Sequence, residues 1–189
     1  MKLENLIDIE DDIYTISNKM RTEIWQFFKN KPSLKIVELG AYKGYTTRFL
    51  AEHFEMVYAV DNNDSYLEEN QEYNNKFRNI EYIKCDVYGS WGDILPVDVD
   101  VVLIDVCHSY DSCKSDLDKS LGYFNGLKYI IFDDYGVFPG VRRVVDEAIG
   151  SSGRLKFERW VGLTDIPGTL GGYVKGSHEG VICSVNRED

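Results

Sequence analysis

The chain has 189 residues, of which 43% are hydrophobic, and its formal net charge is −11. This length and composition fit one domain with a sizeable hydrophobic core. The acidic balance, with an isoelectric point near 4.7, disfavours phosphate backbones and anionic membranes as partners, because both attract clustered Lys and Arg. We therefore expect neither a nucleic-acid nor a membrane partner.

The sequence contains no uninterrupted apolar run of about 18 residues, the length that a membrane span requires. The beginning, MKLENLIDIEDDIY, is acidic where a secretory signal would be basic and then apolar. The four cysteines form no C-x-x-C pair and are predicted to be free thiols: Cys85, Cys107, Cys113 and Cys183. We expect a soluble, intracellular and therefore cytoplasmic protein.

The first predicted element is an amphipathic helix in the N-terminal segment 1–34. Its apolar residues recur at helical spacing before Lys31-Pro32 ends it: Met20, Ile24, Phe27 and Phe28. From Lys35 onwards, short apolar runs alternate with helical stretches, which favours a parallel α/β sheet. The predicted strands lie at 35–39, 56–60, 80–85, 99–104 and 128–132, with two later ones at 157–161 and 180–185. A helix is predicted at 139–149, and the Gly-rich stretch 168–180 is expected to be a surface loop or hairpin.

The segment KIVELGAYKGYTTRFL, residues 35–50, turns from a strand into a helix at a pair of glycines. Glycines at such a turn let the backbone approach a ligand closely, and the helix N-terminus offers unpaired N–H groups. The spacing E-x-G-x-x-x-G differs from that of dinucleotide binders, and Tyr42 is too bulky for a pyrophosphate turn. Glu38 would repel phosphate but could hold a cation or a ligand ammonium group. The turn therefore predicts a site for a ligand without phosphate.

Acidic residues also follow the next two predicted strands. Asp61 comes about 20 residues after Gly40, a position from which a carboxylate accepts hydrogen bonds from both hydroxyls of a ribose. Asp86 could accept one from the exocyclic amine of an adenine. One such acid would most simply be a solvated loop residue, but acids at three successive strand ends favour a ligand site.

This combination resembles the class I methyltransferases that use S-adenosylmethionine, and the resemblance runs from about Lys35 to Ile149. It implies a single Rossmann-like domain: a doubly wound, mostly parallel seven-stranded sheet with helices on both faces and an antiparallel edge strand. The N-terminal helical segment would be 1–34, the cofactor-binding core 35–150 and a C-terminal strand pair 151–189. The implied cofactor residues are Glu38, Gly40, Ala41, Tyr42, Gly44, Asp61, Asn62, Asp86, Val87 and Asp105.

Further acids follow the fourth and fifth predicted strands. Asp105 ends the fourth strand, with His108 three residues later, and Asp133 and Asp134 close the fifth strand. Neighbouring strands would bring these carboxylates together at one edge of the sheet. Crowded carboxylate oxygens favour a divalent ion of the Mg²⁺ type. For Asp133 and Asp134, the alternative is that they only cap the strand-to-helix loop.

The phrases I-D-x-x-H-S-Y, F-D-D-Y and P-G-V-R-R-V-V-D-E resemble those of metal-dependent O-methyltransferases, including enzymes that methylate sugar hydroxyls on macrolide antibiotics. The resemblance implies Asp105, Asp133 and Asp134 as metal ligands, with His108 as the catalytic base. Unaided, a histidine of pKa ~6.5 is about nine units too weak to deprotonate a hydroxyl like that of water, so metal and base belong together. Tyr110 and Asp111 are alternative candidates for the base.

We therefore predict methyl transfer from S-adenosylmethionine to a hydroxyl of a sugar or glycan, assisted by a divalent metal. The acceptor-binding candidates follow the fifth strand or lie in the late strands: Tyr135, Arg142, Arg143 and Trp160. One alternative is a catechol or phenol O-methyltransferase with an aromatic-walled pocket, to which Trp91, Tyr135 and Trp160 could contribute. A non-catalytic methyltransferase-like binding module is another. An NAD-linked oxidoreductase and a base methyltransferase fit the motifs less well, and the oligomeric state stays open.

Overall fold

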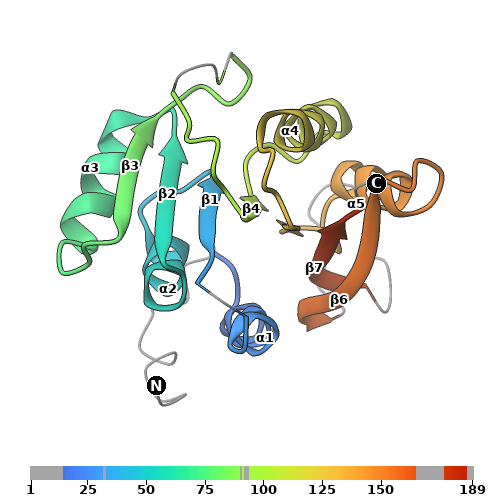
Figure 1. The fold of residues 1–189 in the computed structure, drawn as a ribbon, viewed down its shortest axis with the longest axis horizontal. Helices are drawn as coiled ribbons and strands as arrows, with labels where there is room; N and C mark the ends of the chain where they lie inside the picture. The colour runs from blue at the N-terminus through green and yellow to red at the C-terminus, as the bar shows by residue number, and fades with distance from the viewer. Residues whose placement is uncertain (1–14, 32, 90, 92–93, 165–176, 187–189) are drawn as a thin grey trace.

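The computed structural model describes residues 15–31, 33–89, 91, 94–164 and 177–186. Helices and strands alternate along most of this chain, as the sequence predicted (Figure 1). The elements are α1 (Asn18–Phe28), β1 (Lys35–Leu39), α2 (Tyr45–His53), β2 (Met56–Asp61), α3 (Asp64–Tyr73), β3 (Ile80–Lys84), β4 (Val101–Ile104), α4 (Tyr110–Tyr123), β5 (Tyr129–Phe132), α5 (Pro139–Ile149), β6 (Leu155–Thr164) and β7 (His178–Val185).

The strands form one seven-stranded sheet in the order β3-β2-β1-β4-β5-β7-β6. Strands β1 to β5 pair in parallel, whereas β7 is antiparallel to both β5 and β6. This confirms the predicted sheet, including the late antiparallel pair. Because β7 runs the opposite way, its beginning lies beside the end of β5, where Phe132 pairs with Val181.

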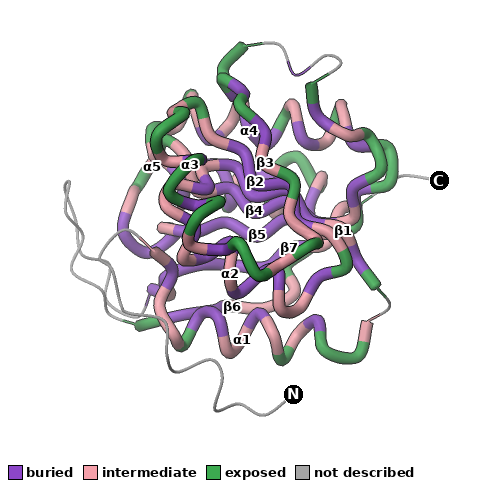
Figure 2. Tube along the Cα trace, turned by 90° about the vertical axis from the view of Figure 1, so that its left-hand side faces the viewer, coloured by how far each residue is buried: buried purple, intermediate pink, exposed green. Residues whose placement is uncertain are grey.

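Strand residues alternate between two hydrophobic cores, one on each face of the sheet. On one face, Val102 and Ile130 pack in a core that includes Leu117 of α4 and Val145 of α5. On the other face, Val101 and Ile131 pack with the apolar sides of α1 and α2. Figure 1 shows these helix pairs on opposite sides of the sheet, and Figure 2 shows the buried strands between them.

The predicted N-terminal helix is confirmed as α1. The Ser17 side chain caps this helix by accepting a hydrogen bond from the N–H of Met20. Residues 1–14 of the predicted N-terminal segment lie outside the described residues, as do residues 168–176 of the Gly-rich stretch. No described helix has the length and apolarity of a membrane span. The four cysteines are free thiols, and Cys107 is the exposed one among them.

The order of the strands reverses between β1 and β4, which creates a crevice at the carboxyl edge of the sheet. There the backbones after the two strands approach each other closely. Gly40 has φ +90°, and a Cβ on it would lie 1.9 Å from the carbonyl oxygen of Asp105. A glycine is therefore required at this position by the packing of the chain itself.

Candidate active site

A cavity of about 1040 Å³ opens at this carboxyl edge. It is continuous from the ends of β1 and β2 to the ends of β4 and β5. Its lining includes five carboxylates: Asp61, Asp105, Asp133, Asp134 and Glu179. This concentration of negative charge in one concave site favours cationic or metal-bound ligands over anionic ones.

Asp61 marks one half of the cavity, which we call the cofactor half. The N–H of Tyr42 donates to one carboxylate oxygen at 3.0 Å, and the N–H of Asn63 donates to the other at 2.9 Å. Each oxygen keeps a further lone pair, so the carboxylate can also accept from a diol. The neighbouring Asn62 lines the cavity, and the rings of Tyr42 and Tyr66 form a wall with their centroids 4.6 Å apart.

Two residues of the predicted glycine turn serve the packing of the turn. Glu38 is 1% exposed and accepts a hydrogen bond from the Thr47 hydroxyl at 2.5 Å. Burial raises the pKa of Glu38 well above its usual range. Gly44 has φ +90° at the N-cap of α2, where a Cβ would lie 2.3 Å from the Asn70 amide oxygen. Neither residue lines the cavity, so their roles in cofactor binding stay predictions.

The remaining cofactor candidates are divided between the lining and its surroundings. Gly40 and Val87 line the cavity, whereas Ala41 is buried behind the turn. Asp86 is exposed outside the lining, and it accepts a hydrogen bond from the N–H of Tyr88 at 3.0 Å. The structure therefore places the main-chain neighbours of Asp86, but not its carboxylate, on the cavity wall.

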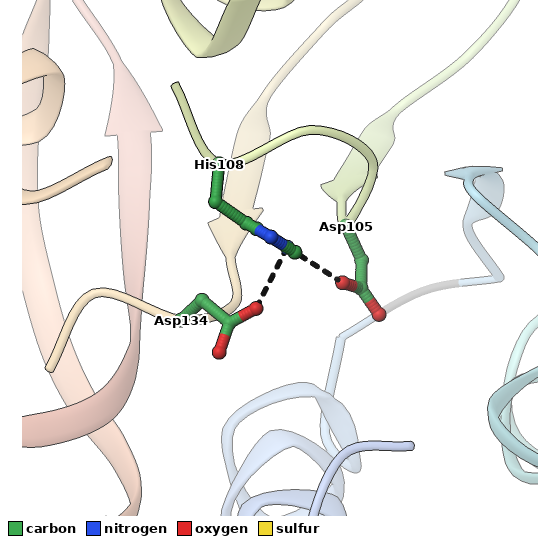
Figure 3. Close-up of side chains that lie close together, drawn as sticks. All are labelled: Asp105, His108 and Asp134. Carbon is green, nitrogen blue, oxygen red and sulfur yellow. Dashed lines mark ion pairs between the residues drawn. The ribbon is translucent and has the colours of Figure 1, made fainter. Parts of the chain in front are cut away.

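The other half of the cavity, the acceptor half, contains an acid–histidine cluster (Figure 3). His108 Nε2 lies 2.8 Å from Asp134 Oδ2 and 3.7 Å from Asp105 Oδ1. One potential ligand atom from each of the three residues lies within 4.8 Å of the others. The predicted convergence of these residues is therefore present in the fold.

Two loops supply this cluster, one between β4 and α4 and the other between β5 and α5. Asp105 directly follows β4, His108 comes just before the Ser109 N-cap of α4, and Asp134 follows β5. Asp134 has φ +59°, a left-handed conformation that is uncommon for a residue other than glycine and is enriched at functional sites. The ring of Phe138 stacks on His108 at 4.2 Å between centroids and fixes its plane.

The charges of this cluster change the protonation of its members. Burial lowers the pKa of His108, but hydrogen bonds and the charges of Asp105 and Asp134 outweigh burial and raise it to about 10. Burial raises the pKa of Asp105, against the opposing effect of His108. Without a bound cation, His108 is therefore protonated at neutral pH and acts as the counter-ion of the two acids.

Asp133 lies beside this cluster and is only 8% exposed. Its Oδ1 atom is buried and has no hydrogen-bond partner among the described residues. Burial, followed by the charges of Asp105 and Asp134, raises the pKa of Asp133 well above its usual range. A carboxylate in this position gains most from a positively charged ligand.

The donor set fits a divalent ion. Ligands about 2.1 Å from an octahedral Mg²⁺ lie about 3 Å apart when adjacent and about 4.2 Å apart when opposite. The clustered atoms of Asp105, His108 and Asp134 already span this range. The buried oxygen of Asp133 is a further donor at the cavity wall.

The four acceptor candidates from the sequence do not line the cavity. The Tyr135 hydroxyl donates to Asp146, and Arg142 donates to the Tyr135 carbonyl oxygen. Arg143 forms an ion pair with Glu147 along α5, and Trp160 packs on Tyr135. Trp91, a candidate aromatic wall for the phenol alternative, is buried in the core.

The alternative candidates for the base also lie outside the lining. The Tyr110 hydroxyl donates to Glu147 at 2.6 Å, and Asp111 lies in the first turn of α4. Among the candidates, His108 alone lines the cavity.

Sequence reasoning missed several lining residues of the acceptor half, among them Ser17, Asn18, Phe138 and Glu179. Glu179 is the second residue of β7, which begins at His178, within the last residues of the predicted Gly-rich loop 168–180. A signal for it existed, because the first residues of an antiparallel strand beside β5 lie at the carboxyl edge of the parallel strands. An acid at the beginning of that strand was therefore a site candidate.

Comparisons with known proteins agree with this architecture. A family model described as "Methyltransferase domain" matches residues 37–135, while no curated protein matches the chain. A Klebsiella pneumoniae protein provisionally assigned as an O-methyltransferase has a similar structure, with a TM-score of 0.70 and 16% identity over 98% of this chain and 88% of that one. Magnesium protoporphyrin IX methyltransferase from Synechocystis PCC 6803, solved with S-adenosylhomocysteine, has a TM-score of 0.60 and 13% identity over 88% and 81%.

At these identities the two structures show a shared fold. A Haemonchus contortus phosphoethanolamine N-methyltransferase, solved with phosphoethanolamine and S-adenosylhomocysteine, is 26% identical with a TM-score of 0.50. That match covers 60% of this chain and 24% of the longer protein. Because the family model spans more than half of the sequence, from β1 to the residues after β5, the chain belongs to the methyltransferase-domain family.

Proposed function

We propose that the protein transfers a methyl group from S-adenosylmethionine to a hydroxyl oxygen of a sugar or glycan, with a divalent cation, most readily Mg²⁺, at the acid cluster. The observation that carries this proposal is the Asp105–His108–Asp134 cluster in the same cavity as Asp61. A methyl donor and a hydroxyl acceptor need adjacent sites, and the cavity provides two chemically different halves.

S-adenosylmethionine suits the cofactor half because it carries an ammonium, a sulfonium and a ribose but no phosphate. Asp61 is available to the ribose diol, and the acidic lining favours the two positive charges of the ligand. Solved members of the fold from Synechocystis and Haemonchus contain S-adenosylhomocysteine, the demethylated form of this donor.

In the acceptor half, the carboxylates of Asp105, Asp133 and Asp134 would hold the cation, and His108 would accept the hydroxyl proton. A divalent cation, when bound, lowers the pKa of a hydroxyl that contacts it. His108 lies within reach of these carboxylates, and its stacking on Phe138 keeps the imidazole in one orientation. Its role as a base requires the neutral form, which depends on positive charge that compensates Asp105 and Asp134.

The lining favours a sugar over a catechol. The aromatic residues expected for a phenol pocket, Trp91, Tyr135 and Trp160, all lie outside the cavity. The acceptor half instead combines the Phe138 ring with polar side chains such as Asn18 and Glu179. Polar groups beside an aromatic ring are suited to a hydroxylated acceptor that has an apolar face.

The test combines binding with turnover. Calorimetry measures the binding of S-adenosylhomocysteine, and transfer of a labelled methyl group is measured with methyl glycosides and with catechol. EDTA is expected to abolish transfer and Mg²⁺ to restore it, whereas S-adenosylhomocysteine binding survives chelation because the cofactor half has its own contacts.

Each outcome separates one alternative. Full methyl transfer in EDTA would contradict the proposed requirement for a divalent metal, and transfer to catechol alone would establish the phenol alternative. Binding of S-adenosylhomocysteine without transfer to any hydroxyl would favour a non-catalytic module. Binding of NAD without S-adenosylhomocysteine would overturn the proposal as a whole.

A further inference from the structure

Glu179 connects two segments that are far apart in the sequence. The N–H of Ser17 donates to its Oε1 at 2.7 Å, and the Ser17 hydroxyl donates to its Oε2 at 2.5 Å. The N–H of Leu163, near the end of β6, donates to the same Oε2 at 2.8 Å. The side chain is 7% exposed and borders the cavity. A buried carboxylate with three donors makes strong, charge-assisted hydrogen bonds.

The segment held by Glu179 crosses the cavity. Residues 15–19, which we call the N-terminal wall, include four lining residues, among them Ser17, Asn18 and Lys19. The wall has a second anchor at its other end, where the hydroxyls of Thr15 and Thr46 lie 2.9 Å apart. Thr46 belongs to the first turn of α2, next to the glycine turn of the cofactor half. The wall therefore spans from the cofactor half to the acceptor half.

The β6 side of this connection is shaped around the carboxylate. Gly162 has φ +88°, and a Cβ on it would lie 2.3 Å from Glu179 Oε2. The N–H of Gly162 donates to Glu23 of α1 at 2.7 Å. Two acids thus join α1 to the same corner of β6, but only Glu179 borders the cavity. Glu23 is for this reason a matched control.

We propose that Glu179 is a positioning residue that fixes the N-terminal wall against the acceptor half and so determines how a hydroxylated acceptor is seated. Asn18 uses its amide oxygen to accept from Arg21 at 2.7 Å, which leaves its NH₂ group as a donor at the lining. Lys19 adds an ammonium donor on the same wall. These donors lie on the wall, while the sheet edge supplies the carboxylates of the proposed cation site, a division that suits a hydroxylated acceptor. The acceptor part of this inference rests on the proposed function.

Glu179→Gln tests the connection with almost no change in shape. Oε1 and Oε2 each accept a backbone N–H, from Ser17 and Leu163 respectively. A glutamine has one oxygen and one NH₂ group, so in either orientation it places a donor against one of these N–H groups. One backbone bond is therefore lost whichever way the amide turns.

Hydrogen exchange of the full chain reports on the wall without any turnover. In Glu179→Gln, the amides of residues 16–20 are expected to exchange at least tenfold faster. In Glu23→Gln, exchange rises at Gly162 while residues 16–20 stay within twofold of the wild type. Ser17→Ala, which removes the hydroxyl from the same connection, is expected to act in the direction of Glu179→Gln. Unchanged exchange at 16–20 in both Glu179→Gln and Ser17→Ala would overturn the proposal.

Kinetics distinguish positioning from a general loss of structure. With the glycoside or catechol that the wild type methylates, Glu179→Gln is expected to raise the acceptor KM at least tenfold, with kcat changed less than threefold and S-adenosylhomocysteine affinity within twofold. An unchanged KM, or an equal effect of Glu23→Gln, would overturn the acceptor role. If the wild type methylates no hydroxyl, the proposed function fails, and the exchange measurement still decides the connection.

Discussion

The two halves of the cavity differ in how far the protein itself pairs their charged groups. At the ends of β1 and β2, the polar groups have partners within the protein: Glu38 accepts from Thr47, and Asp61 accepts from two backbone N–H groups. At the ends of β4 and β5, the carboxylates of Asp105 and Asp134 lie close to one imidazole, and Asp133 lies beside them. The buried Oδ1 of Asp133 has no hydrogen-bond partner among the described residues.

This difference indicates what each half needs from a ligand. The cofactor half is already arranged, so binding there costs little reorganisation. The acceptor half contains more negative than positive charge, and burial, together with repulsion between like charges, raises the pKa of both Asp105 and Asp133. A cation bound there would relieve this repulsion. The acceptor half, whose charges are less well compensated in the free protein, is therefore the half suited to the metal and the reaction.

The largest expected effect is on the chemistry of the acceptor half. His108→Ala removes the one imidazole of the cluster and is expected to lower kcat by about 10²–10⁴, the range for a positioned general base. Metal binding should persist if His108 is a base, because the carboxylates remain. Steady-state kinetics together with Mn²⁺ titration check both expectations, and loss of Mn²⁺ binding would instead identify His108 as a ligand.

Two neighbouring residues provide the control for this prediction. Tyr110→Phe and Asp111→Asn change the rival candidates for the base, which lie outside the lining. We expect kcat to stay within threefold of the wild type in both variants. A fall in kcat in either variant, as large as that in His108→Ala, would move the base away from His108.

The next largest effect concerns the cofactor half. Asp61→Ala is expected to weaken the binding of S-adenosylhomocysteine by at least ~1.5 kcal/mol, the scale of a charge-assisted hydrogen bond. This corresponds to about tenfold in Kd. Asp64→Asn is the control, because Asp64 begins α3 nearby and lies outside the lining. Calorimetry on both variants checks the difference. Equal affinities in Asp61→Ala and the wild type would remove Asp61 from the binding site.

Much of this architecture could be predicted from the sequence. The alternation of apolar runs with helical periodicity predicted the sheet, and parallel strands place their carboxyl ends at one edge. For that reason Asp105, His108 and Asp134 could be brought together before their distances were known. The two late strands were also predictable, because two β-rich runs flank a Gly-rich stretch, whereas their antiparallel pairing was implied by the family resemblance.

The remainder depends on contacts that no local pattern encodes. Gly44 was predicted to serve a ligand, yet its backbone packs against the Asn70 side chain from α3. Tyr135 and Arg142 follow β5 closely, but they turn toward α5 and bond with each other and with Asp146. Glu179 enters the site through the strand order β5-β7-β6, which sequence separation alone does not reveal.

A smaller effect should separate function from stability within the acceptor half. Asp133→Asn removes a carboxyl group whose pKa is raised by burial and by its neighbours. Because its ionised form is unfavourable in the fold, the metal-free variant is expected to be more stable than the wild type at pH 8, by about 1 kcal/mol. Mn²⁺ affinity should fall at least tenfold, because a ligand charge is lost. Urea unfolding with and without Mn²⁺ measures both, and lower stability without metal would contradict the contrast between the halves.

The last expected effect concerns the loss of stability caused by a buried charge that no ligand compensates. Asp116 of α4 is fully buried, and neither carboxylate oxygen has a partner among the described residues. Burial raises the pKa of Asp116 to about 6, against a weaker opposing effect of Lys119. The folded state therefore binds a proton more tightly than the unfolded state, so its contribution to stability is lost as pH rises from about 4 to about 6.

Asp116→Asn cannot titrate, so its stability relative to the wild type is expected to increase by about 1–3 kcal/mol between pH 4 and pH 7. Any constant cost of the buried amide cancels in this difference between two pH values.

Asp118→Asn in the same helix is the control of opposite sign, because hydrogen bonds from Lys114 and Arg154 outweigh burial and lower the pKa of Asp118. Its disadvantage relative to the wild type grows only up to about pH 4, the ordinary range of an aspartate, so it should change little between pH 4 and pH 7. Urea unfolding at both pH values measures the two variants, and Mn²⁺ and S-adenosylhomocysteine affinities should be unchanged because Asp116 lies outside the cavity lining. A pH-independent difference for Asp116→Asn would show that the fold stabilises this carboxylate as well as water does. It would then be less clear that the unpaired carboxylates of the acceptor half favour binding of a cation.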